Sequence, residues 1–353
     1  MTSIATSAST ASVAGGAASG LSPTDAPLAI TTSGLTKRYG ERLAVDGLDL
    51  ALPSGVVAGF VGPNGAGKTT TMAMLLGLVR PSGGTGTVLG TPIAEPAGYL
   101  PRVGALIEHP AFYPSLTGVQ NLRHLATVAG FDRDDRELGA LLDLVGLAGR
   151  GDDRYRGYSL GMKQRLGIAA ALLGDPQLLI LDEPANGLDP EGVREMRTLI
   201  DGLTGRGRTV LVSSHDLSEL EQVCDWLVLI DAGRGVYQGP TRDLLDGAVG
   251  GLAVAAADPA QQAALEALLR TAGHPVEAQG DRLVIGLDHP GPSGSRAEPP
   301  PGGRERHREG DVAALAAAVN RAAFDAGVVL VELTPLRATL EERYLALVRE
   351  AHR

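Results

Sequence analysis

The chain has a single cysteine, Cys224, among its 353 residues. One cysteine cannot form an internal disulfide or build a cysteine-based zinc site, and such scarcity fits a reducing compartment. Basic residues are outnumbered as well: 31 Lys and Arg against 41 Asp and Glu give a net charge of −10. Because nucleic acid phosphates bind to basic surfaces, this balance argues against a broad nucleic-acid-binding face, and we expect no nucleic acid partner.

Aromatic residues make up only 3% of the sequence, although hydrophobic residues make up 44%. The core must therefore be built mainly from Ala, Leu, Val and Ile. No apolar run reaches the roughly 18 residues that a membrane-spanning helix needs. The first residues lack the basic start and the apolar stretch of a secretory signal peptide. The sequence thus predicts neither a transmembrane segment nor a signal peptide.

Glycine is in excess, with 48 residues, about twice the usual share. The length allows two or three domains. Residues 1–28 are mostly Ala, Ser, Thr and Gly, so we expect a disordered tail; a misassigned start or an unrecognised targeting sequence stays open. We expect residues 29–247 to form the main domain. Residues 251–353 are expected to form a small α/β domain with a disordered, Pro- and Gly-rich loop at about 289–310.

Residues 29–247 alternate short β-rich runs with helical ones, which predicts parallel strands covered by helices. The strands predicted there are 56–62, 178–182, 209–213 and the pair 226–231 and 235–238. The helices predicted there are 67–79, 117–130, 134–148, 160–174, 190–204 and 216–224. The small domain is predicted to have strands at 252–256, 283–286 and 328–333, and helices at 259–272, at about 311–326 and from Leu336 onward.

The strongest motif follows the first of these strands and opens the first helix. It fits the phosphate-loop pattern G-x-x-x-x-G-K-[ST], which needs this strand and helix context. Its glycines let backbone N–H groups approach a phosphate without Cβ clashes, and the helix N-terminus adds a favourable dipole. Its lysine can reach the β- and γ-phosphates, and its threonine hydroxyl can ligate Mg²⁺. The motif is Gly62, Pro63, Asn64, Gly65, Ala66, Gly67, Lys68 and Thr69.

Two carboxylates, Asp182 and Glu183, end the apolar strand that begins at Leu178. In a parallel sheet this places them at the edge where phosphates bind. Asp182 is suited to hold Mg²⁺, directly or through water, and Glu183 to polarise the attacking water. The alternative is that both acids are merely solvated at the strand tip, and the phosphate loop makes that alternative weak.

A third motif, Tyr158–Arg165, lies shortly before that strand. Ser159 is a good N-cap for the helix predicted at 160–174, and Gly161 permits close backbone approach. This helix start is suited to an anion, although an ordinary capped helix would have the same residues.

Further along the chain come Asn186-Gly187-Leu188-Asp189-Pro190 and Ser213-Ser214-His215-Asp216. Together with the phosphate loop, the Ser-x-Gly-x-x-Gln helix start and the Asp-Glu strand, this ordered set resembles the ATP-binding cassette (ABC) ATPases over about residues 30–247. It is most similar to ATP-binding subunits of bacterial exporters of the antibiotic-resistance and bacitracin-immunity type, whose permeases are separate chains. The resemblance implies ATP and Mg²⁺ as cofactors. It also implies a P-loop NTPase fold, with a RecA-like parallel sheet, an antiparallel β part and an α-helical subdomain at about 105–175.

The resemblance also implies roles for residues outside the phosphate loop. Tyr39 stands where the family stacks an aromatic on adenine, although a plain surface aromatic stays possible. Ser159 and Gly161 stand in the signature segment that contacts the γ-phosphate of the opposing subunit, and Leu160 and Met162 depart from its usual residues. The same resemblance places Thr70 and Gln164 in the nucleotide site, Asp189 in the loop linking the two sites of a dimer, and His215 at the γ-phosphate sensor.

Glu108 departs from the family, which usually has a glutamine there that touches Mg²⁺, water and the permease. A carboxylate is also a hard oxygen ligand for Mg²⁺, so we expect function to be retained. The alternative is that Glu108 points to solvent. Next to it, Phe112 and Tyr113 are two adjacent aromatics in a chain poor in them, and either permease docking or core packing would explain them.

The sequence thus predicts the ATP-hydrolysing subunit of an efflux transporter for a drug, antibiotic or peptide. The resemblance implies a second, identical ATP-binding subunit, a separate ABC-2-type permease, and a location on the cytoplasmic face of the membrane. Two alternatives remain: the energising subunit of an importer, and a soluble cassette protein acting on ribosomes or DNA.

Overall fold

The computed structural model describes residues 27–107, 112–204, 207–245, 249–286, 304–337 and 339–351. The expectations for residues 1–26, for Glu108 and for the loop up to residue 303 lie outside these ranges. Within them, no helix combines the length and the apolar content needed to cross a bilayer.

The centre of the molecule is a six-stranded sheet with the order β10-β9-β3-β8-β7-β6. Every neighbouring pair is parallel except β9 and β10, which confirms the parallel strands and the antiparallel pair predicted from the sequence. The strands are β3 (Val57–Val61), β6 (Val103–Leu106), β7 (Leu178–Leu181), β8 (Thr209–Ser214), β9 (Trp226–Asp231) and β10 (Arg234–Pro240).

Both faces of this sheet are covered, so its central strands are continuously apolar. In β7 all four residues are buried, with Leu179 and Leu181 facing one hydrophobic cluster and Leu178 and Ile180 the other. This division follows from the alternation of side chains along a strand. The first cluster joins the sheet to helices and the second to α1 and the antiparallel strands.

An antiparallel sheet with the order β2-β1-β4-β5 packs against the second cluster. Its strands are β1 (Leu28–Tyr39), β2 (Arg42–Pro53), β4 (Gly83–Val88) and β5 (Thr91–Pro92). The sequence patterns did not locate these strands. Register shifts between Thr32 and Leu35 and on to Arg38 break the apolar alternation that would have shown β1.

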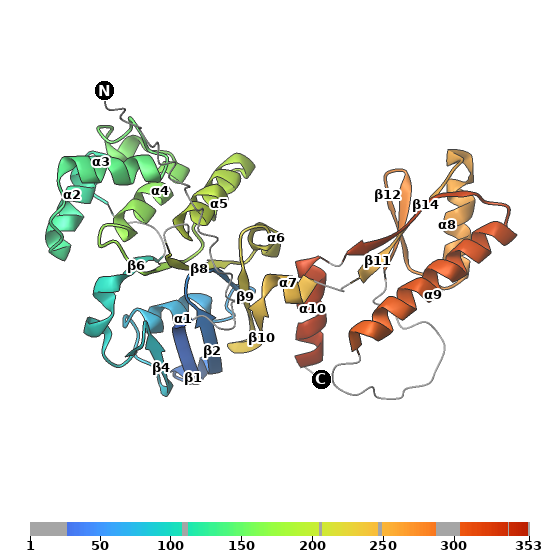
Figure 1. Ribbon diagram of the computed structural model, residues 1–353, viewed down its shortest axis with the longest axis horizontal. Coiled ribbons are helices and arrows are strands. Elements are labelled where there is room, and N and C mark those ends of the chain that lie inside the picture. Colours follow the sequence, from blue (N-terminus) through green and yellow to red (C-terminus); the bar gives the residue numbers. More distant parts are fainter. Residues whose placement is uncertain are drawn as a thin grey trace, which may run out of the picture.

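Helices cover the central sheet, and α2, α3 and α4 gather at one end of it (Figure 1). Capping boxes begin two of them, Thr117 with Gln120 at α2 and Asp134 with Glu137 at α3. The α-helices of this part are α1 (Lys68–Leu75), α2 (Gly118–Ala129), α3 (Asp135–Leu144), α4 (Leu160–Ala171), α5 (Pro190–Thr204), α6 (Leu217–Glu221) and α7 (Thr241–Leu245). The 3-10 turns are η2 (Pro96–Gly98), η3 (Leu100–Arg102) and η4 (Tyr155–Gly157).

A second lobe follows α7 and has its own antiparallel sheet, β12-β13-β11-β14, and its own buried cluster (Figure 1). Its helix α9 was predicted from about residue 311 but begins at Arg304. The earlier start has a local cause, because residues 304–309 contain only Arg, Glu and His, which tolerate a helix, and the Gly- and Pro-rich run ends at Gly303. The elements are β11 (Val249–Ala256), η5 (Pro259–Gln261), α8 (Gln262–Thr271), β12 (Val276–Gln279), β13 (Arg282–Gly286), α9 (Arg304–Asp325) and β14 (Leu330–Arg337).

The last helix, α10 (Leu340–Ala351), begins later than the predicted Leu336. Leu336 instead pairs with Gly251 in the sheet, and Thr339 and Glu342 form reciprocal cap hydrogen bonds that start the helix. The helix also packs elsewhere than expected: Leu340 and Tyr344 belong to the buried cluster of the main domain. Residues 251–353 therefore do not all pack as one unit, because the chain returns to the main domain after β14.

This return predicts that α10 stabilises the main domain. Leu340 is fully buried and Leu345, on the same helix, is 44% exposed. We expect Leu340→Ala to lower the free energy of unfolding by about 2–5 kcal/mol through the cavity it leaves. Leu345→Ala, the matched control, should change it by less than about 0.5 kcal/mol. Urea denaturation of the full chain measures both, and equal effects would contradict the packing of α10.

Candidate functional site

The phosphate-loop residues 62–67 connect β3 to α1 and are held closely by neighbouring backbone. A Cβ at Gly62 would lie 2.3 Å from the carbonyl oxygen of Ile230, and one at Gly67 would lie 2.5 Å from that of Ala44. Gly65 and Gly67 also have φ values of 85° and 103°, which L side chains rarely adopt. Glycine is therefore required here both by space and by backbone conformation.

Lys68, the first residue of α1, is 6% exposed. Its ammonium group donates a hydrogen bond to the Gly62 carbonyl oxygen at 2.7 Å and lies 3.3 Å from Oε1 of Glu183. A buried cation needs such partners, because desolvation would otherwise neutralise it. The lysine of the loop and the second acid of the Asp-Glu strand thus meet across the end of the sheet.

Asp182 lies at the centre of a short hydrogen-bond network. Thr69 Oγ1 donates to its Oδ2 at 2.7 Å, and Ser213 Oγ donates to its Oδ1 at 2.5 Å. Ser213 is fully buried at the end of β8, and its oxygen also accepts the Glu183 N–H at 2.9 Å. The Ser213 hydroxyl therefore contacts the carboxylate of Asp182 and the backbone of Glu183. The Thr69 hydroxyl lies beside the other oxygen of the Asp182 carboxylate. Ser213 entered the sequence analysis only as part of a motif, without a role.

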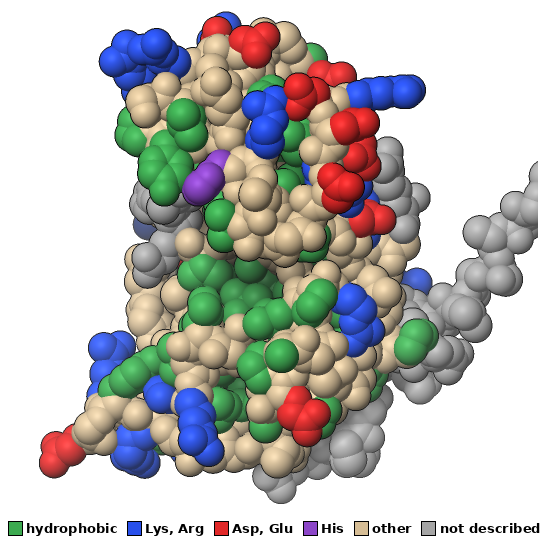
Figure 2. Space-filling view, turned by 90° about the vertical axis from the view of Figure 1, so that its left-hand side faces the viewer, with side chains coloured by type: hydrophobic (Ala, Val, Ile, Leu, Met, Phe, Trp, Pro, Cys, Tyr) green, Lys and Arg blue, Asp and Glu red, His purple; other side chains and the backbone are tan. Residues whose placement is uncertain are grey.

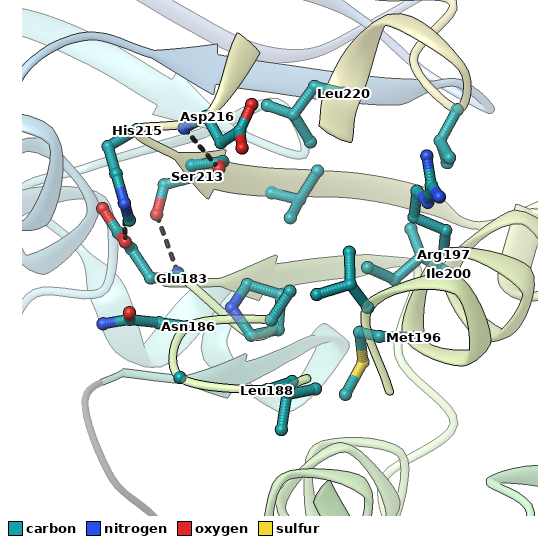
Figure 3. Close-up of a pocket in the computed structure, with 17 residues that line it drawn as sticks. Glu183, Asn186, Leu188, Met196, Arg197, Ile200, Ser213, His215, Asp216 and Leu220 are labelled. Carbon is teal, nitrogen blue, oxygen red and sulfur yellow. Dashed lines mark hydrogen bonds and ion pairs between the residues drawn. The ribbon is translucent and has the colours of Figure 1, made fainter. Parts of the chain in front are cut away.

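Glu183 has a φ of 47°, a left-handed conformation that is unusual for a residue with a side chain. This backbone turns its carboxylate toward His215, and Nδ1 of His215 lies 2.6 Å from Oε2. Figure 3 shows the two side chains facing each other at the rim of a cavity, with Ser213 behind them. Strain of this kind is common where a side chain must be aimed at a reacting group.

The cavity beside this pair has a volume of about 130 Å³ and a mainly apolar wall (Figure 3). The loop Pro184–Leu188 and the start of α5 form one side of it, and β8 and α6 form the other. Asp189 lies just beyond this loop, where its Oδ1 accepts the Gly192 N–H at 2.8 Å and caps α5.

A second pocket, of about 330 Å³, lies over the phosphate loop. Tyr39, at the end of β1, lines it and is 49% exposed, and Nζ of Lys37 lies over its ring at 4.9 Å from the centroid. Arg42 lines it too, and sequence reasoning missed it; its place three residues after an adenine-stacking candidate was the available signal. The pocket is lined by Tyr39, Arg42, Ala44, Asn64, Gly65, Gly67, Lys68, Thr69, Thr70 and Glu183.

The signature residues at the start of α4 do not reach this pocket. The hydroxyl of Ser159 caps the helix by accepting the Met162 N–H at 3.3 Å. Leu160 is 39% exposed and reaches the loop after Glu183, where its Cδ2 would lie 3.2 Å from a Cβ at Gly187. Gln164 is buried, and its Oε1 has no hydrogen-bond partner among the described residues. Ser159 and Gly161 are thus separate from the phosphate loop of their own chain.

The two adjacent aromatics after β6 divide between the two predicted explanations. Phe112 packs edge-on against Tyr155 at a centroid distance of 5.1 Å and joins the buried cluster. Tyr113 is 55% exposed and contacts the ring of His124. Core packing therefore accounts for Phe112, and only Tyr113 remains available to a partner.

Cys224 is not a candidate nucleophile. Burial raises the pKa of its thiol far above the ordinary value, with a smaller contribution from the nearby Asp225 carboxylate. The thiol packs near Gly59 of β3.

Comparisons with known proteins converge on one family. A family model described as ABC transporter matches residues 45–186. The bacitracin transport ATP-binding protein BcrA of Enterococcus faecalis is 46% identical over 211 residues, which are 59% of this chain and 68% of that protein. The daunorubicin/doxorubicin resistance ATP-binding protein DrrA of Streptomyces peucetius is 41% identical over 219 residues, which are 61% of this chain and 66% of that protein. The Nod factor export ATP-binding protein I of Burkholderia orbicola is 35% identical over 275 residues, which are 77% of this chain and 90% of that protein.

The chain thus spans about two thirds of the first two of these relatives. Among solved structures, an ATP binding subunit of an ABC transporter is 30% identical, with a TM-score of 0.55 over 62% of this chain and 92% of that one. The cbiO1 protein of Clostridium perfringens, part of the transporter complex cbiONQ, is 25% identical, with a TM-score of 0.55 over 62% and 90%.

The role of Ser213 can be tested by stability. We expect Ser213→Ala to lower the free energy of unfolding by about 1–3 kcal/mol, because it leaves the Glu183 N–H without its acceptor. The exposed Ser218→Ala is the matched control and should change it by less than about 0.5 kcal/mol. Denaturant unfolding distinguishes the two, and a Ser213→Ala protein as stable as the parent would contradict the network.

Proposed function

The chain belongs to the ATP-binding subunits of ABC transporters and is an ATPase, and from this premise we propose that it energises the efflux of a drug, antibiotic or peptide. The observation that carries the ATP-hydrolysing part of this proposal is the convergence of Lys68, Asp182 and Glu183 at one end of the central sheet. The names of two relatives favour export, since one is a daunorubicin/doxorubicin resistance protein and the other a Nod factor export protein.

In the proposed reaction each residue acts through its observed position. Lys68 and the N–H groups of the phosphate loop bind the β- and γ-phosphates. Tyr39 stacks on the adenine, and Arg42 adds positive charge to the same pocket. Glu183 accepts a proton from the attacking water, and His215 holds the carboxylate in place through the 2.6 Å contact. Lys68 also faces Glu183. Phosphate binding would therefore draw the lysine away from the carboxylate, which would then be able to accept the proton of the attacking water.

The donor set suits Mg²⁺. The described residues include no group of three or more His, Cys, Asp or Glu side chains placed to hold a metal. Mg²⁺ nonetheless prefers few protein ligands together with substrate phosphates and water, and Thr69 Oγ1 and Asp182 Oδ2 lie 2.7 Å apart. These two residues would hold the ion, with Glu108 as a further proposed ligand. When bound, Mg²⁺ offsets the charge that develops on the phosphates.

Members of this family pair their ATP-binding subunits and work with a transmembrane permease. We propose an identical partner arranged head to tail, so that Ser159 and Gly161 complete the partner's nucleotide site and Asp189 links the two sites. Gln164 is buried in its own chain and would support this helix start from within. The separation of the α4 start from the phosphate loop of its own chain supports this arrangement. A single copy would then hydrolyse ATP very slowly.

We propose an ABC-2-type permease, which would hold the chain at the cytoplasmic face of the membrane. Figure 2 shows the end of the molecule where the permease would dock, with apolar side chains in a hollow between its upper and lower parts. The exposed residues Leu100 and Tyr113 precede and follow β6 in the chain. A permease helix could bury both.

The role of Glu183 as proton acceptor predicts the behaviour of Glu183→Gln. The amide keeps the size of the side chain but cannot take the proton, so kcat should fall by about 10²–10⁴-fold. Because ATP stays bound, size-exclusion chromatography with MgATP should show a stable dimer. Hydrolysis at the parental rate would show that Glu183 is not the base. Glu95→Gln, on an exposed residue away from the site, is the control and should behave as the parent does.

Docking to a permease predicts the effect of Tyr113→Asp. The buried charge should abolish co-purification with the co-expressed transmembrane permease, while ATP binding stays at the parental level. Phe324→Asp, at an 81% exposed residue of the second lobe, should still co-purify.

Co-purification of the parent with ribosomes would favour the soluble alternative, and a neighbouring gene for a solute-binding protein would favour import.

A further inference from the structure

The phosphate loop rests on the hairpin formed by β9 and β10. The Gly233 N–H at the hairpin turn donates to the Ala66 carbonyl oxygen at 3.0 Å. The carbonyl of Ile230, at the end of β9, lies against Gly62 so closely that a Cβ there would be 2.3 Å away. Strand β9 also pairs in parallel with β3, which leads into the loop. The position of the loop is therefore tied to the position of this hairpin.

The opposite side of the same hairpin is covered by α10. Tyr344 is buried against it, and its hydroxyl donates a long hydrogen bond of 3.5 Å to the Ile230 carbonyl oxygen. Val236 and Tyr237 of β10 pack against the same hydrophobic cluster as Tyr344. One carbonyl group, that of Ile230, thus lies between the first glycine of the phosphate loop and the C-terminal helix.

The helix is anchored at this place by further contacts. Leu340 is fully buried, and Nε of Arg343 donates to the Leu244 carbonyl oxygen of α7 at 3.1 Å. Figure 1 shows α10 between the main domain and the second lobe, beside α7. The chain leaves the main domain through α7 and returns through α10, so both connections to the second lobe meet next to the hairpin.

We propose that Tyr344 is a positioning residue for nucleotide binding: through Ile230 it holds the β9–β10 hairpin against Gly62, so that the affinity for ATP depends on how α10 is seated. The proposal rests on the proposed function only in taking residues 62–69 as the nucleotide site. It gives the second lobe a mechanical connection to that site.

The Tyr344 hydroxyl is suited to act as a constant hydrogen-bond donor to the Ile230 carbonyl oxygen. Burial, together with the nearby Asp231 carboxylate, raises the pKa of Tyr344 to about 12. The phenol therefore keeps its proton and stays a donor at neutral pH.

The test compares three variants of the full chain by the Kd of a fluorescent ATP analogue and by urea unfolding. Tyr344→Ala removes the ring and should raise the Kd roughly three- to tenfold, with a smaller change in kcat at saturating ATP. Tyr344→Phe keeps the ring but removes the hydroxyl donor, so its Kd should lie between those of the parent and Tyr344→Ala. Leu138→Ala, at a fully buried residue of α3 on the far side of the main domain, should lose stability but keep the parental Kd.

A parental Kd in folded Tyr344→Ala, or an equal rise in Leu138→Ala, would overturn the proposal. If Tyr344→Ala does not fold, hydrogen exchange of the amides of residues 62–69 in Tyr344→Leu replaces it. Faster exchange there than in the parent supports the proposal, and unchanged exchange overturns it. A parent that binds no nucleotide would instead overturn the proposed function. The exchange measurement would still test whether Tyr344 holds the hairpin against residues 62–69.

Discussion

The close approach of the phosphate loop to surrounding backbone is the constraint on which this structure depends. At Gly62 and Gly67 there is no room for a side chain, because the carbonyl oxygens of Ile230 and Ala44 lie where a Cβ would be. The loop is thus defined by the strands packed around it. The site can be no better ordered than β2 and the β9–β10 hairpin, which is why α10, far away in the sequence, bears on it.

Electrostatics add a second requirement. A nearly buried lysine faces a carboxylate with an unusual backbone conformation, and that carboxylate faces a histidine. The Lys68 ammonium group offsets the negative charge of the Glu183 carboxylate, and His215 contacts the other oxygen of the same carboxylate. The serine at the end of β8 contacts both acids. Lys68, Asp182, Glu183 and His215 are thus already close together at one end of the central sheet in the chain by itself.

The comparison of sequence with structure separates local signals from distant ones. The parallel strands and their helices were predictable, because apolar runs and capping residues act over a few positions. The first hairpin was missed because its bulges break the alternation, and the start of α10 was missed because Leu336 pairs with a strand some 85 residues earlier. In the site, Arg42 was not selected although it lies three residues after Tyr39. Ser213 was given no role, because only the packing of β8 beside β7 shows that its hydroxyl meets Asp182.

The sequence by itself determined the family, the phosphate loop and the acidic strand, since a backbone that must wrap phosphate leaves only glycine at fixed positions. Only the tertiary structure decided that Phe112 belongs to the core while Tyr113 stays exposed, and that the C-terminal helix returns to the main domain. Both depend on which apolar side chains pack against which elements of the fold. The spacing of apolar residues in the sequence shows that one face of an element must be buried, but the tertiary structure decides which other element buries it.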